Sequence, residues 1–167
     1  RGMKNNTNHS AGHGTCNLNK APHMFAHLVK VISSERFLKM QGLGNEIPFF
    51  ICPFKAENAF EIDQMRRQLA NKLTQEGVSV LEIDLYDLSI NLLRQRGLFD
   101  RLIGMEAEMP KDHLLETLGN VLDPRSYLVP EIAGISESAG DYDVMFICGV
   151  GEVFPYIRSH NILEDLQ

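Results

Sequence analysis

A glycine turn near the end of the chain is the first place where the residue types could support chemistry. The segment Phe146–His160 reads FICGVGEVFPYIRSH, so an apolar run ends at Gly149 and Gly151. A strand, a glycine turn and a helix follow one another in this way in many proteins that hold phosphate on backbone amides. The first question is therefore whether this turn binds a nucleotide or a phosphate ester.

The residues that follow the turn argue against bound phosphate. A Walker loop needs a lysine and a serine or threonine, but Glu152, Val153 and Phe154 follow Gly151 here. A dinucleotide fingerprint needs a third small residue where Phe154 stands, and the Glu152 carboxylate would repel a phosphate. We therefore expect Gly149 and Gly151 to serve backbone geometry, and we expect no cofactor.

Three other groups of residues invite a chemical reading. Asp84 and Asp87 follow a second apolar run, where two acids could hold magnesium or cap the next helix. Cys148 precedes the glycine turn and could be a nucleophile, although a buried structural thiol is the commoner role. Arg158 and His160 could contact an acidic group of a partner or simply face solvent. None of these groups forms a complete catalytic set.

Possible metal ligands are concentrated near the start of the chain. They are His9, His13, Cys16, His23 and His27. Imidazole and thiolate suit zinc, but the spacing matches no common zinc finger, so we assign no metal ligand and leave metal binding there open. Residues 1–22 are rich in Asn, Gly and His, which predicts a flexible tail or a cloning-derived segment.

Length, charge and cysteine content narrow the class of protein. The chain has 167 residues, 44% of them hydrophobic, which is enough for one domain with its own core. A net charge of −6 argues against coating nucleic acid, unless Arg94, Arg96, Arg101 and Lys111 gather on one face. The absence of an apolar run of about 20 residues argues against a membrane span. Three widely separated cysteines favour a reducing, cytoplasmic compartment.

The hydrophobic pattern predicts a single α/β domain over residues 23–167. Strands are expected at 47–54, 78–85 and 142–148, and helices at 24–40, 58–77, 87–96, 98–108, 112–122 and from about 153. The segment 127–135 is ambiguous, and 136–141 reads as a loop. Asn58 with Glu61, and Asp87, are expected to cap the helices that they open.

Alternation of strands with helices predicts three layers, in which a short, mostly parallel, Rossmann-like sheet is flanked by helices. Three strands are few for such a sheet, and the sequence stops inside a predicted helix. We therefore expect the last strand of the sheet to be missing, so that the domain is C-terminally incomplete.

Three segments carry a resemblance to a known family. They read GLGNEIPFF (Gly42–Phe50), VLEIDLYDL (Val80–Leu88) and GVGEVFPYIRSHNIL (Gly149–Leu163). Together they resemble the BrxB family, small components of BREX bacteriophage-exclusion systems that were long catalogued as a domain of unknown function. The last segment is the most specific, because its residue order matches no generic nucleotide loop. The similarity covers roughly Ser33–Gln167.

The resemblance implies a bacterial, cytoplasmic protein with a role in antiviral defence. Family members work beside a methyltransferase, a large ATPase and an alkaline-phosphatase-like protein called PglZ. The family has no established catalytic residues to transfer to this chain. Its members also continue past the equivalent of NILEDLQ into another strand, which again implies an incomplete sheet.

The expected function is that of a non-catalytic adaptor that assembles a BREX complex through protein–protein interaction, with a PglZ-like subunit as its partner and nucleic acid reached only through the complex. One alternative is an enzyme that binds a nucleotide or phosphate ester at the Gly149–Gly151 turn, and a second is direct nucleic-acid binding. Candidate contact residues are Asn45, Glu46, Asp84, Gly149, Gly151, Glu152, Arg158 and His160. The partner surface and the oligomeric state stay open.

Overall fold

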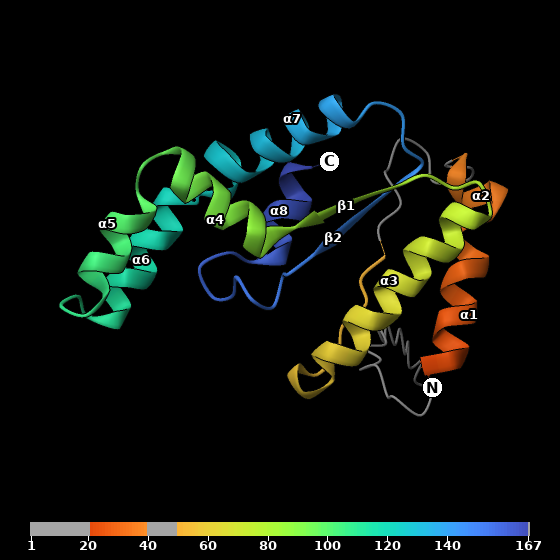
Figure 1. Cartoon of the computed structure of the whole chain (residues 1–167), viewed down its shortest axis with the longest axis horizontal. Helices are drawn as coiled ribbons and strands as arrows, with labels where there is room; N and C mark the ends of the chain where they lie inside the picture. The colour runs from red at the N-terminus through yellow and green to blue at the C-terminus, as the bar shows by residue number, and fades with distance from the viewer. Residues whose placement is uncertain (1–20, 40–49, 167) are drawn as a thin grey trace, which may run out of the picture.

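The computed structural model describes residues 21–39 and 50–166, and only the backbone of residues 21–23 (Figure 1). The α-helices are α1 Ala21–Ile32, α2 Glu35–Leu38, α3 Ala59–Gln75, α4 Leu85–Gln95, α5 Phe99–Glu106, α6 Lys111–Val121, α7 Val129–Ala139 and α8 Ser159–Asp165. A 3₁₀ turn η2 covers Ala56–Asn58, and a π-helical turn η3 covers Pro124–Leu128. The strands are β1 Val80–Asp84 and β2 Val144–Cys148. Residues 1–20, most of the predicted N-terminal segment 1–22, lie outside the described part.

The two strands pair in parallel, with Val80 opposite Val144 and Asp84 opposite Cys148. Side chains alternate between the two faces of the sheet, as the pleat of a strand requires. Val80 and Val144 pack into the cluster formed with α1 and α3, whereas Ile83 belongs to the cluster on the opposite face. The carboxyl ends of both strands therefore meet at one edge, which brings Asp84 next to the start of the glycine turn.

Helices cover both faces of the sheet. On one face α1 and α3 lie side by side (Figure 1), and Ile32, Leu69 and Leu73 are buried between them and the strands. On the other face α4, α7, α8 and η3 enclose the larger cluster, which contains Leu85, Leu92, Leu122, Leu128, Ile132, Ile157 and Ile162. The predicted α/β class, with a short parallel sheet flanked by helices, is confirmed.

One predicted strand is wrong in its described part. Residues 50–54 of the expected strand 47–54 form no strand, and Phe50, Ile51 and Phe54 are exposed. Pro53 has no N–H to donate to a ladder, and the Phe50 ring packs against Phe37 of α2, with 5.3 Å between ring centroids. Residues 50–54 therefore form a loop that contacts α2 through the Phe50 ring. Residues 47–49 lie outside the described part.

The helix predicted from about Val153 is also wrong, because α8 begins only at Ser159. Residues 150–157 form successive turns instead. The Ile157 N–H donates to the Val153 carbonyl over 3.0 Å, so one helical turn forms and buries both side chains. The turn ends at Arg158, whose backbone is extended (φ −115°, ψ 137°), and α8 begins only after it.

Two predicted caps differ from the structure. Asn58 is buried and makes no side-chain hydrogen bond to α3, so it forms no capping box with Glu61. Asp84, not Asp87, caps α4, because the helix begins at Leu85 directly after β1. A carboxylate on the residue just before a helix can accept hydrogen bonds from the free N–H groups of the first turn. Asp87 lies within that first turn of α4, so its carboxylate cannot cap it.

The helix α7 extends further than the pattern predicted. It runs through residues 136–139, which were expected to belong to a loop, and it resolves the ambiguous segment 127–135 as helical. Pro130 stands in the first turn of α7, where its missing N–H costs no helical hydrogen bond.

Candidate functional site

The candidate site lies at the carboxyl edge of the sheet, where Asp84 ends β1 and Gly149 follows β2. The Asp84 carboxylate caps α4: its Oδ1 accepts hydrogen bonds from the N–H of Tyr86 at 2.9 Å and of Asp87 at 3.2 Å. The carboxylate that was considered as a magnesium ligand is therefore already engaged as a helix cap. Among the described residues, no group of three or more His, Cys, Asp or Glu side chains is placed to hold a metal ion.

Gly149 packs directly on this cap. Its φ is +72°, a left-handed conformation that favours glycine. A Cβ atom at Gly149 would lie 2.6 Å from Asp84 Oδ1 and 3.1 Å from the backbone nitrogen of Tyr86. Glycine is needed here both for its backbone angle and for the close approach of the two strand ends, and the Asp84 carboxylate lies beside the turn where an anion would have to bind.

The amides of the turn are partly engaged within it. The N–H groups of Glu152 and Val153 both donate to the Gly149 carbonyl, at 3.0 and 3.3 Å. No helix begins at this point, so the turn does not present the row of free N–H groups that holds a phosphate. The left-handed φ of Gly149 agrees with the backbone role that was expected for this residue.

Cys148 is held in a form that is poorly nucleophilic. Its Sγ lies 3.4 Å from Asp84 Oδ2 and 3.6 Å from the Ile83 carbonyl, so the thiol donates a weak hydrogen bond toward acceptors. Burial, and then the negative charge of Asp84, raise the pKa of the Cys148 thiol to about 11. Because the thiolate is the reactive species, this cysteine stays a neutral thiol near pH 7.

An ion-pair group that the sequence analysis did not identify lies on the α3 side of the sheet. Arg66 forms salt bridges with Asp63, one turn earlier on α3, at 2.7 Å and with Glu82 of β1. The hydrogen bond from Arg66 is the main cause that lowers the pKa of Asp63. The spacing of Asp63 and Arg66 was visible in the sequence, but their strand partner Glu82 could be found only from the packing of α3 on β1.

A shallow hollow of about 540 Å³ lies beside the turn. We call it the turn hollow, and it is lined by Val150, Gly151, Phe154, Ile157 and residues 158–160. Phe154 exposes 64% of its surface, whereas Val153 and Ile157 expose 0% and 1%. Two buried anchors therefore hold this loop against the core and leave Phe154 projecting at the surface.

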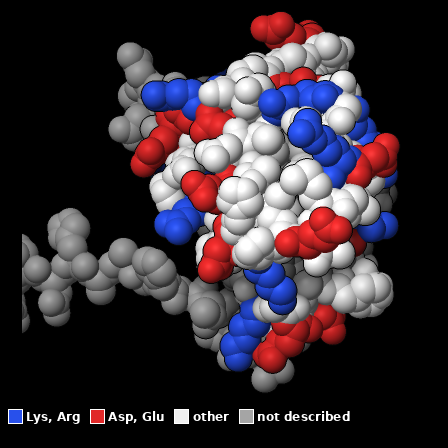
Figure 2. Space-filling model, turned by 90° about the vertical axis from the view of Figure 1, so that its left-hand side faces the viewer, with Lys and Arg blue, Asp and Glu red and all other residues white. Residues whose placement is uncertain are grey.

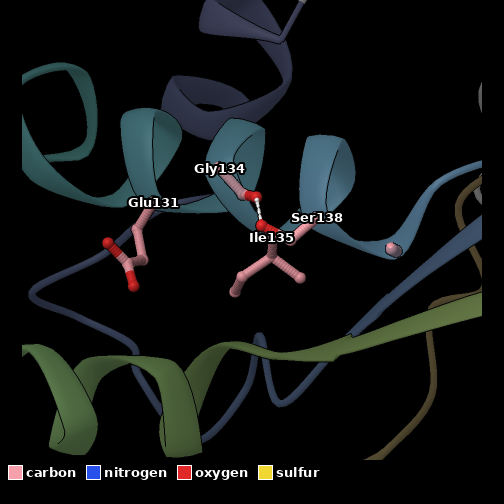
Figure 3. A pocket seen from close by; sticks show the side chains of 5 residues that line it. Glu131, Gly134, Ile135 and Ser138 are labelled. Atoms are coloured by element: carbon pink, nitrogen blue, oxygen red, sulfur yellow. Dashed lines mark hydrogen bonds between the residues drawn. The ribbon is translucent and has the colours of Figure 1, made fainter.

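A second hollow, of about 500 Å³, lies along α7 (Figure 3). Its lining residues all belong to α7, with Glu131, Ile135 and Ser138 among them. The Ser138 hydroxyl donates to the Gly134 carbonyl at 2.7 Å, so the helix itself uses this group. One carboxylate beside an engaged hydroxyl offers no catalytic set, and we assign no function to this hollow.

The structure brings together only some of the predicted site residues. Asp84 meets Gly149, whereas Gly151, Arg158 and His160 line the turn hollow. Glu152 is exposed on the turn but does not line the hollow. The remaining candidates Asn45 and Glu46 lie outside the described residues, as do His9, His13 and Cys16 of the possible zinc set. His27 is exposed on α1, and the side chain of His23 is not described.

Comparison with known proteins decides the family. The family model described as "BREX protein BrxB" matches residues 81–167, which is more than half of the chain. The chain belongs to the BrxB family. The matched residues include β2, all of β1 except Val80, the Asp84 cap and the whole turn hollow, so the resemblance carried by the Gly149–Leu163 segment is confirmed.

Two curated relatives share this family name. "BREX protein BrxB" of Bacillus cereus (strain H3081.97) is 29% identical over 136 residues, which cover 81% of this chain and 71% of that protein. "BREX protein BrxB" of Escherichia coli O9:H4 (strain HS) is 25% identical over 136 residues, which cover 81% of this chain and 66% of that protein. No solved structure matches the chain. No helix in the described ranges is both long and apolar enough to cross a bilayer.

Proposed function

We propose that this BrxB-family chain is a non-catalytic assembly subunit of a BREX complex and that it docks a PglZ-like subunit. The name that both relatives carry supports membership of a BREX system. The observation that carries the non-catalytic role is the contact of Gly149 with the Asp84 cap. The residues that looked most like a nucleotide site have structural tasks there.

The loop that contains this turn also displays side chains suited to protein contact. Phe154 and Arg158 are exposed beside each other on the loop between β2 and α8, and aromatic and arginine side chains dominate the binding energy of protein interfaces. A surface loop anchored by Val153 and Ile157 is a suitable contact surface for an assembly subunit.

Co-purification tests the assembly role. The affinity-tagged full chain is expressed together with the other subunits of its BREX operon, and the eluted proteins are identified by mass spectrometry. We expect the PglZ-like subunit to elute with the chain in a constant ratio through gel filtration. If no BREX subunit elutes with it, the proposed function is wrong.

A thermal-shift measurement tests the non-catalytic part. ATP, GTP and NAD are added separately, with and without magnesium, and the melting temperature of the chain is recorded. We expect no change, because the Asp84 carboxylate lies against the turn that would hold the phosphates. A concentration-dependent rise in melting temperature would show ligand binding to the folded state and would favour the enzyme alternative.

A further inference from the structure

We infer that the turn hollow is the docking point of the chain and that it takes an acidic segment of the partner in which a carboxylate stands next to a large apolar side chain. This inference rests on the proposed function, because it assumes that the chain docks another BREX subunit. It adds the place of contact and the chemistry of the segment that fits there.

The positive charge of the lining favours a carboxylate on the partner segment. The turn hollow is lined by Arg158 and His160 and by no Asp or Glu, although the whole chain has 22 acidic against 16 basic residues. Within the described ranges Arg158 forms no ion pair, and it is exposed. An arginine without a partner can bind a carboxylate through two parallel hydrogen bonds, which gives both affinity and orientation.

The apolar part of the lining favours the second feature of the partner segment, a large apolar side chain. Phe154 exposes 64% of its surface and lines the same hollow as Arg158. Its neighbour Val153 and the nearby Ile157 are almost fully buried, so the backbone that bears the ring is already fixed before binding. Because this backbone is fixed, an apolar side chain that packs on the ring costs only the rotamer freedom of the Phe154 side chain.

A phosphate-bearing partner fits this surface less well than a carboxylate. Nucleic acid and phosphorylated segments are usually bound by several cations, and the lining supplies one arginine and one histidine. Glu152 is exposed on the same turn, two residues from Phe154, and its charge repels a phosphate group of nearly two negative charges more than a single carboxylate. A single carboxylate flanked by an apolar side chain matches the pair formed by Arg158 and Phe154.

Matched substitutions test the location of the contact. Phe154→Ser and Arg158→Glu change the turn hollow, whereas Phe60→Ser on α3 and Arg101→Glu on α5 change a phenylalanine that is 71% exposed and an exposed arginine elsewhere. The affinity of each full-length variant for the co-purified PglZ-like subunit is measured by calorimetry. We expect Kd to rise roughly 10-fold or more for each hollow variant, as for interface hot spots, and less than about 3-fold for the controls.

Salt dependence tests the acidic character of the partner segment. Raising NaCl from about 50 to about 300 mM should weaken the wild-type complex, and this weakening should be smaller for Arg158→Gln, which keeps a polar side chain but no charge. A complex whose affinity is unaffected by salt, or whose salt dependence is unchanged in Arg158→Gln, would overturn the acidic assignment.

The outcomes separate this inference from the proposed function. If the wild-type chain binds no BREX subunit, the proposed function fails and this inference fails with it. If the wild type binds and the hollow variants bind equally well, only the docking point is wrong. Equal losses of affinity in the hollow and control variants also overturn this inference. A dimer of the chain that Phe154→Ser dissociates overturns it as well, because the occupant of the hollow is then a second copy of the chain. If a hollow variant melts at a lower temperature, Phe154→Leu and Arg158→Gln replace it.

Discussion

At the scale of single residues, the contact between Gly149 and Asp84 gives a structural reason for a glycine turn whose sequence resembles a phosphate loop. The carboxylate caps α4, and the glycine lets β2 end directly against that cap. The two residues are 65 positions apart, so each one was identified in the sequence without its partner. The glycine is therefore required by a structural contact, and no ligand is needed to explain it.

The Gly149→Ala change should destabilise the chain by about 3 kcal/mol, as the sum of backbone strain at positive φ and overpacking against Asp84. The matched control is Gly77→Ala, where φ is +84° but no atom lies within 4 Å of an added Cβ. That variant should lose only about 1 kcal/mol, from backbone strain alone. Urea unfolding followed by circular dichroism measures both values. Equal losses of unfolding free energy in the two variants would show that the contact with Asp84 does not contribute to the cost of Gly149→Ala.

At the scale of secondary structure, periodicity predicted the elements that have an apolar face against the core. The strands at 80–84 and 144–148 and the helices α3, α4, α5 and α6 appear within a few residues of their expected positions. In α3, Ile62, Leu69 and Leu73 are buried as the helical spacing predicted. For these elements, local sequence and tertiary burial favour the same conformation.

The wrong predictions have a common physical cause. Residues 50–54 are apolar enough for a buried strand, and residues 153–157 have the spacing of a helix, but whether either forms depends on what the rest of the fold packs against it. In the candidate site, the conformational role of Gly149 could be predicted from its neighbours. A cap by an acid after the second strand was predicted, although for Asp87. The contact of Asp84 with Gly149 and the hollow at Phe154 could not be predicted, because they depend on the strand register and on where α4 and α8 begin.

The two strands are also joined at their other end. The Asp143 Oδ2 accepts hydrogen bonds from the Ser79 N–H at 2.7 Å and from the Ser79 hydroxyl at 2.9 Å, and the Asp143 N–H donates to the Ser79 carbonyl at 3.0 Å. This pair immediately precedes Val80 and Val144, the first residues of the ladder. We infer that it fixes the register from which the rest of the parallel pair follows.

The Ser79–Asp143 pair should make stability depend on pH on the acid side. The hydrogen bonds from Ser79 lower the pKa of Asp143 below its ordinary value of 3.8, so their contribution is complete above that value and is lost as the pH falls through the lower, folded-state pKa. Asp143→Ala should therefore be less stable than wild type at pH 7, and the difference should shrink below about pH 4. Urea midpoints measured from pH 7 to pH 3 test this, with Asp141→Ala as the control. A difference that stays constant, or grows toward low pH, would contradict the role of Asp143.

At the scale of the whole molecule, the distribution of charge bears on whether the chain itself contacts nucleic acid. The chain has a net charge of −6. Figure 2 shows acidic and basic side chains interspersed on the face toward α5 and α6, with uncharged surface between them. Two of the arginines that a nucleic-acid-binding face would need stack on aromatic rings. Arg94 Cζ lies 4.9 Å from the centroid of the Phe99 ring, and Arg96 Cζ lies 3.8 Å from the centroid of the Tyr127 ring.

The isolated chain should therefore bind duplex DNA weakly or not at all at physiological salt. We expect no gel shift of a random-sequence duplex in about 200 mM NaCl, because a chain that makes few phosphate contacts releases few counterions and gains little affinity for the DNA backbone. Any residual shift at about 50 mM NaCl should weaken in Arg101→Glu, whose side chain is exposed on α5, and not in Arg67→Glu, whose guanidinium pairs with Asp63 on α3. A shift that survives about 200 mM NaCl would revive direct nucleic-acid binding. If the isolated chain gives no shift and the reconstituted complex does, the DNA contacts belong to other subunits, and the surface that matters on this chain is the one that holds its partner.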